Sequence, residues 1–143
     1  MPLSTQDTIS VGAVVGYRRW CESAGQNPVI QTPGDADVAA ASVAAAVAEG
    51  VDAIYAVSAQ QQAVLDGIAR AGRRCPDDVQ VLGIGTGLME VLFRPALSAI
   101  DLEGTASGAA IADLCVSRLA GADTRVAELP WHLADRGTTR PAG

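Results

Sequence analysis

The sequence lacks lysine, is poor in aromatic residues and contains no long apolar run. Arginine supplies all 10 positive charges against 16 acidic residues, which leaves a net charge of −6. Because the chain shows no basic face or arm, we do not expect these residues to bind nucleic acid themselves. No apolar run approaches the length of a membrane span, and the first residues lack a charged-then-apolar signal pattern. We therefore expect a cytoplasmic protein that makes no membrane contact.

Cysteine and histidine are sparse as well. The three cysteines, Cys21, Cys75 and Cys115, are widely spaced and lack the spacing of metal ligands, so free thiols in a reducing compartment are expected. The only histidine, His132, lies beside Trp131 with no nucleophile motif to activate. No nucleophile elbow and no metal cluster is present in the sequence. We therefore expect no enzymatic activity, no metal and no cofactor.

Small apolar side chains are abundant. Hydrophobic residues make up 49% of the 143 and aromatic residues only 3%, so Ala, Val, Leu and Ile are expected to form the core. The length fits one domain. Such a core is typical of α/β layers that pack closely together.

The clearest pattern is a strand, a helix and a strand over residues 51–84. Residues 51–57 and 79–84 are short apolar runs, and between them apolar residues recur at helical spacing over residues 60–71. Two buried strands joined by one helix predict a parallel, right-handed βαβ unit. Ligands of open parallel sheets bind beyond the carboxyl ends of the strands. Here those ends are Ser58 and the turn 85–87.

The other segments extend this unit on both sides. Asp37 is expected to begin an alanine-rich helix over residues 38–48, with Val38, Ala41, Ala45 and Ala48 facing the sheet. The remaining elements are predicted in chain order as a helix (11–24), a strand (29–32), a short helical piece (88–93), a strand (96–102), a helix (103–121), a strand (125–133) and a polar tail (136–143). Together they predict an α/β fold with an open, mostly parallel five-stranded sheet and helices on both faces.

Five segments, taken in order, resemble the effector-binding region of the LacI/GalR family of transcriptional regulators. They are GYRRWCESAG (16–25), DAIYAVSA (52–59), CPDDVQVLGIGT (75–86), RPALSAIDL (94–102) and LADRGTT (133–139). The resemblance implies the C-terminal part of a two-lobed, periplasmic-binding-protein-like sensor, without the DNA-binding headpiece and most of the N-terminal lobe. It also implies that the helix over residues 103–121 belongs to the missing lobe. We therefore expect its apolar side, near Ile111, Leu114 and Leu119, to be covered by another chain or left exposed.

The resemblance places ligand contacts at Ser58, Gly85, Thr86 and Asp101. Several polar side chains of the family pattern are absent, because Ala13 stands for an arginine, Gly85 for an aspartate and Leu102 for a polar residue. A sugar site needs converging hydrogen-bonding groups to replace water. Two alternatives therefore stay open: the effector is not a typical sugar, or the module only dimerises.

A glycine-rich turn and an apolar group complete the candidate sites. Residues 83–87 suggest a dinucleotide site, but they do not form the full phosphate fingerprint and come late in the chain. The resemblance places Gln62, Met89, Leu92 and Phe93 at a subunit interface, with ordinary core packing of the apolar three as the alternative.

Taken together, the sequence predicts the sensing and dimerisation module of a LacI/GalR-type regulator. Its expected partners are a small-molecule effector such as a sugar, a second copy of the chain, and operator DNA only through the missing headpiece. The alternative is a stand-alone sugar-binding protein of a transport system, which would require an export signal. An α/β enzyme is disfavoured because no catalytic groups converge.

Overall fold

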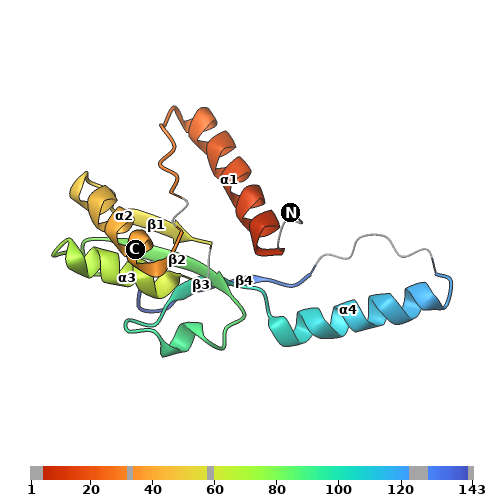
Figure 1. Cartoon of the computed structure of the whole chain (residues 1–143). Coiled ribbons are helices and arrows are strands. Elements are labelled where there is room, and N and C mark those ends of the chain that lie inside the picture. The colour runs from red at the N-terminus through yellow and green to blue at the C-terminus, as the bar shows by residue number, and fades with distance from the viewer. Residues whose placement is uncertain (1–4, 32–33, 58–59, 123–128, 142–143) are drawn as a thin grey trace.

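The computed structural model describes residues 5–31, 34–57, 60–122 and 129–141 (Figure 1). Its elements follow the order α1 (Thr5–Ala24), α2 (Ala36–Ala48), β1 (Ala53–Ala56), α3 (Gln61–Arg70), β2 (Gln80–Gly85), the 3-10 turn η1 (Glu90–Leu92), β3 (Ser98–Asp101), α4 (Gly104–Leu119) and β4 (His132–Ala134). Among the helices in these ranges, none has the length and apolar character needed to cross a membrane.

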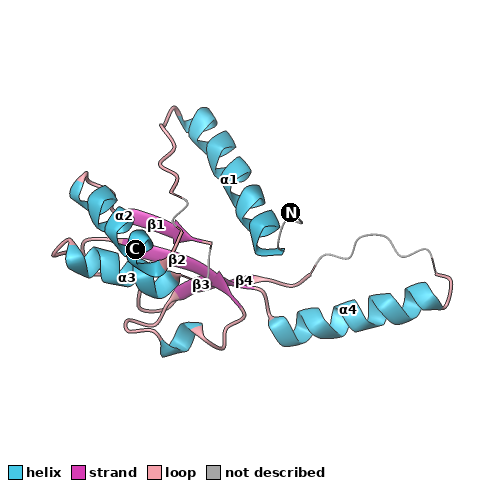
Figure 2. Ribbon diagram, in the orientation of Figure 1, coloured by secondary structure: helices cyan, strands magenta, loops and turns pink. Residues whose placement is uncertain are grey.

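The described strands form one mixed sheet in the order β1-β2-β3-β4. β1, α3 and β2 make the predicted parallel βαβ unit, in which Ile54 pairs with Val81. β3 also runs parallel to β2, but β4 runs antiparallel to β3. A parallel strand would need a helix that crosses back over the sheet. α4 leads away from the sheet instead (Figure 2), so the chain returns at the carboxyl end of β3 and runs the opposite way.

Two predicted strands therefore differ from the structure. The described residues of the predicted strand 29–32 form no strand, and Gln31 Nε2 donates instead to Ser42 O on α2 at 3.2 Å. The last strand is only three residues long, and residues 125–128 of its predicted range lie outside the described ranges. The described part of the chain thus contains four strands, and its helices α2 and α3 pack on one face of the sheet.

The alanine-rich helix α2 presents a different side to the sheet from the predicted one. Asp35 caps its N-terminus, because its carboxylate accepts a hydrogen bond from Val38 N at 2.9 Å. Val38 itself is half exposed. The buried residues are instead Ala39, Ala40, Val43, Ala46 and Val47. In this segment alanines occupy every side of the helix, so the pattern carries little information about the buried face.

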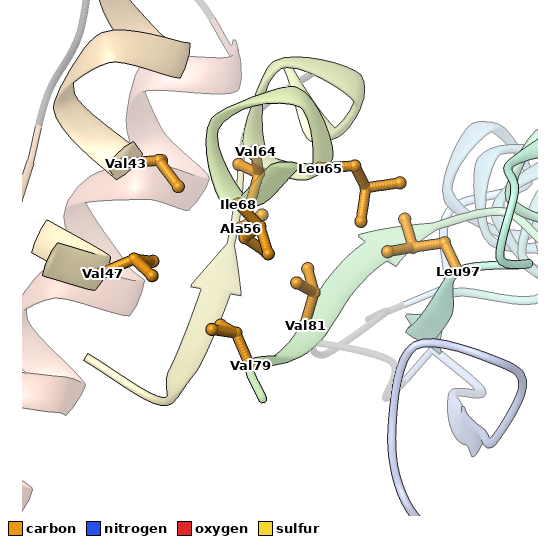
Figure 3. Close-up of a cluster of buried hydrophobic side chains, with 9 residues drawn as sticks. All are labelled: Val43, Val47, Ala56, Val64, Leu65, Ile68, Val79, Val81 and Leu97. Carbon is orange, nitrogen blue, oxygen red and sulfur yellow. The ribbon is translucent and has the colours of Figure 1, made fainter. Parts of the chain in front are cut away.

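The core lies between these two helices and the sheet. Valines of α2 and β2 meet Val64, Leu65 and Ile68 of α3, and Leu97 closes the cluster next to β3 (Figure 3). The two helices approach closely because Gly67 of α3 has no side chain. A Cβ at that position would lie 2.6 Å from Ala40 O and 2.7 Å from Val43 Cβ.

The polar tail connects the two central strands at their starting ends. Thr138 is fully buried, and its hydroxyl donates to Val81 O and accepts from Ser98 N, both at 2.8 Å. Its carbonyl accepts from Val81 N at 2.9 Å. Arg136 adds hydrogen bonds to Leu97 O and to the Ser98 hydroxyl, each at 2.8 Å. The tail therefore takes the place of direct β2–β3 pairing before Leu82 and Ser98, where the ladder begins.

The long helices at either side of the sheet are far less buried. No residue of α4 is buried, and Leu119 is 88% exposed. The expectation that its apolar side would not pack on the chain's own sheet is therefore confirmed. α1 also stands apart from the sheet in Figure 1, and it exposes Val11, Val15 and Trp20.

Candidate functional site

The candidate site lies where β2 and β3 end. Gly85, the last residue of β2, pairs with Asp101, the last residue of β3, and Leu102 N donates to Gly85 O at 2.9 Å. Thr86 follows in the turn. Three of the four predicted ligand residues are thus neighbours at one edge of the sheet. Ser58, the fourth, lies outside the described residues.

An open groove runs between this edge and the start of α4. Thr86, Gly87, Leu88, Gly104 and Thr105 line it, around a volume of about 540 Å³. A second hollow shares Thr86 and Gly104 with the first and continues toward acidic and imidazole side chains, lined in addition by Asp101, Glu103 and His132. The groove therefore combines small side chains, two hydroxyl groups and a polar end.

Asp101 is engaged by the protein itself. It is 6% exposed, its Oδ1 accepts from Glu103 N at 2.9 Å, and its Oδ2 lies 3.5 Å from Arg136 Nη2. These contacts hold the start of α4, where Glu103 adopts the left-handed conformation (φ 45°). The Glu103 carboxylate in turn lies 3.0 Å from His132 Nδ1. His132 thus pairs with Glu103 through a side chain that is half exposed.

Two carboxylates fill the space that glycines leave open at this edge. A side chain on Gly85 would overlap with the carboxylate of Glu90, and one on Gly87 would overlap with that of Asp101. Glu90 is buried and was not among the predicted site residues. Glycine at the end of a buried strand often marks the close approach of another group, which is the signal that could have revealed it. A phosphate would meet like charge here, which argues against a dinucleotide.

The other chemistry-bearing side chains lie elsewhere. All three cysteines are free: Cys21 is buried, Cys75 half-buried and Cys115 exposed. Burial raises the pKa of the Cys75 thiol and of the Tyr55 phenol. Within the described ranges, no group of three or more His, Cys, Asp or Glu side chains could hold a metal ion.

The predicted interface residues are divided between surface and core. Met89 and Leu92 are 58% and 63% exposed, and Gln62 is exposed on α3. Phe93 instead packs against the core cluster, as the alternative prediction had it. The neighbouring Leu88 and Val91 are also exposed, so η1 and the residue pair before it carry a contiguous apolar surface.

Comparison with known proteins identifies the fold. Among solved structures, a LacI family transcriptional regulator from Bifidobacterium animalis subsp. lactis superposes with a TM-score of 0.77 at 21% identity, over 94% of this chain and 51% of that one. A LacI family regulator from Arthrobacter sp. FB24 in complex with lactose gives 0.73 at 27% identity, over 98% and 52%. A complex of the transcriptional regulator CelR with cellobiose gives 0.68 at 26% identity, over 90% and 42%.

The resemblance to LacI-type regulators is thereby confirmed, and the chain spans about half the length of the structures it matches. No curated protein sequence matches it significantly. The family model described as periplasmic binding protein-like domain matches residues 4–139. The chain therefore belongs to the periplasmic binding protein-like domain family.

Proposed function

We propose that this chain is the ligand-sensing and dimerisation module of a LacI-type transcriptional regulator. The observation that carries the proposal is the likeness over 98% of the chain, at 27% identity, to a regulator bound to lactose. The CelR–cellobiose complex supports a sugar as effector. The module is not an enzyme and acts in the cytoplasm. A transport binding protein is disfavoured because each of the three structures described above is a transcriptional regulator.

We infer that the chain forms the C-terminal part of a two-lobed sensor. α4 supports this inference, because a 16-residue helix with exposed Ile111 and Leu119 needs a partner outside the described sheet. A second lobe that includes α4 would close over the groove next to Gly85, Thr86 and Asp101. A ligand that binds the closed form better shifts the population of dimer geometries. The spacing of DNA-binding headpieces attached to that dimer changes with it.

The test is calorimetric titration of the full-length protein with lactose, cellobiose, ribose and a purine panel. A saturable heat of binding with at least one sugar is expected, and the absence of any sugar binding would contradict a sugar effector. The coding sequence upstream separates the two classes of protein: a helix-turn-helix supports the regulator, and a secretion signal supports the transport protein.

The apolar surface at η1 is proposed as the dimer interface. Replacing both Met89 and Leu92 by Asp places two charges in an apolar contact. We expect the dimer to weaken at least roughly 100-fold, because each buried unpaired charge costs more than about 1.4 kcal/mol, the equivalent of a tenfold change. Sedimentation velocity over a concentration series measures this change.

Val38→Asp is the matched control for the interface. Val38 is a half-exposed apolar residue on α2, away from η1. The control variant should remain as dimeric as the wild type, and far-ultraviolet circular dichroism should show that both variants are folded. A Met89→Asp, Leu92→Asp double variant that dimerises normally would show that the interface lies elsewhere.

A further inference from the structure

Glu90 carries a buried carboxylate without a full set of partners. Only 6% of the residue is exposed, and its Oε2 is buried and forms no hydrogen bond with a described residue. Its backbone carbonyl is engaged, because it accepts from Leu97 N at 2.9 Å. An unpaired buried acceptor is costly, and a carboxylate more so than a neutral group. Packing alone does not explain why a protein would keep such a buried, unpaired carboxylate.

The carboxylate points to the end of β2. It occupies the space that a side chain on Gly85 would take, at the edge where open parallel sheets bind their ligands. One carboxylate approaches each glycine of this turn: Glu90 lies against Gly85, and Asp101 lies against Gly87. The structure thus places an unused hydrogen-bond acceptor against Gly85. Glu90 itself does not line the groove, but Thr86, the residue after Gly85, lines it together with Thr105.

Building on the proposed function, we propose that Glu90 is a specificity-determining residue of this groove, where its carboxylate accepts a hydrogen bond from a hydroxyl group of a neutral polyol. Oε2 makes no hydrogen bond with a described residue, so a rotation of the side chain toward the groove costs no hydrogen bond of this oxygen with those residues. Gly85 offers no side chain that would block this movement. A ligand hydroxyl then supplies the missing donor.

The charges around the groove exclude anionic ligands. Arg136, the cation at this edge, is bound to Asp101 and to Leu97 O. A phosphorylated or carboxylated sugar would therefore meet the carboxylates of Glu90 and Asp101 without a free cation among the described residues at the groove. Like charges brought together in a partly dry site repel strongly. The ligand class is a neutral polyol and not a sugar phosphate.

The first measurement is stability without ligand. Glu90→Met keeps the length of the side chain and removes the unpaired carboxylate. We expect its melting temperature to exceed that of the wild type by about 3 °C or more, because removing a buried unsatisfied group stabilises the free protein. A melting temperature below the wild type would show that the carboxylate is a structural group, and would overturn the proposal.

The second measurement is binding, by titration of the full-length protein with lactose, cellobiose, ribose and ribose 5-phosphate. Glu90→Gln keeps the shape and removes the charge, and it should weaken binding of the neutral sugar about tenfold, as expected for one hydrogen bond to a charged group. Glu49→Gln is the matched control, since Glu49 caps α2 and is exposed. It should bind the sugar as the wild type does.

The outcomes separate the two proposals. Unchanged sugar affinity in Glu90→Gln overturns the role of Glu90 and leaves the sugar-sensing function standing. Tighter binding of ribose 5-phosphate than of ribose overturns the exclusion of anions. No binding of any neutral sugar by the wild type contradicts the sugar-sensing function and, with it, the assignment of a polyol to Glu90.

Discussion

Thr138→Val is expected to lower the free energy of unfolding by about 3 kcal/mol, because two buried groups lose their partner at once. The hydroxyl of Thr138 donates to Val81 O and accepts from Ser98 N, and all three residues are fully buried. Valine has the same shape and cannot form either bond. In a domain of this size the melting temperature should fall by about 10 °C. Urea denaturation followed by circular dichroism measures the difference.

Thr138→Ser separates the hydrogen bonds from packing. Serine keeps the hydroxyl and loses one methyl group, so about 1 kcal/mol is the expected cost. Thr105→Val makes the same chemical change as the test variant on the exposed surface of α4, and should change stability by less than about 0.5 kcal/mol. Equal losses in the valine and serine variants at position 138 would mean that the tail is held by packing alone.

Gly67→Ala is expected to destabilise the chain by about 2–3 kcal/mol, although alanine is the better helix former. The new methyl group would lie 2.6 Å from Ala40 O and 2.7 Å from Val43 Cβ. A backbone carbonyl cannot turn aside as a flexible side chain can, so α2 and α3 must move apart. That movement also loosens the contacts of Val43 with the core cluster. The change appears as a lower urea midpoint.

Gly108→Ala tests the same substitution with the opposite expected sign. Gly108 lies within α4, and a Cβ there would meet nothing within 4 Å. Only the helix propensity changes, so a gain of up to about 1 kcal/mol is expected. If both glycine variants shift stability in the same direction, close packing does not explain the effect at Gly67.

The βαβ unit could be predicted from sequence because its two signals agree. Apolar runs of strand length border a helix whose apolar residues include Val64, Leu65 and Ile68, all of which are buried. The ends of its strands also pointed to Gly85 and Thr86, and of these Thr86 lines the groove. In this unit the local sequence pattern therefore agrees with the structure that the whole fold adopts.

The features that could not be predicted from the sequence depend on contacts between residues far apart in the chain. Val29 lies in an apolar run whose described residues pair with no described strand. Because alanines occur on every side of α2, the sequence did not show which face of that helix is buried. A glutamate in a short helix is expected on the surface. Glu90 is buried instead, because Gly85 has no side chain and leaves room for its carboxylate. Thr138 reads as part of a polar tail, because its partners Val81 and Ser98 lie 57 and 40 residues earlier.

The tail that joins the two central strands also affects the order of folding during synthesis. β2 and β3 leave the ribosome long before residue 138, so the first residues of these strands lack the hydrogen bonds of Arg136 and Thr138 while α4 is translated. Long-range contacts of this kind slow folding and expose strand edges in the meantime. We therefore expect nascent chains that stop before Arg136 to be the form of this protein that chaperones recognise.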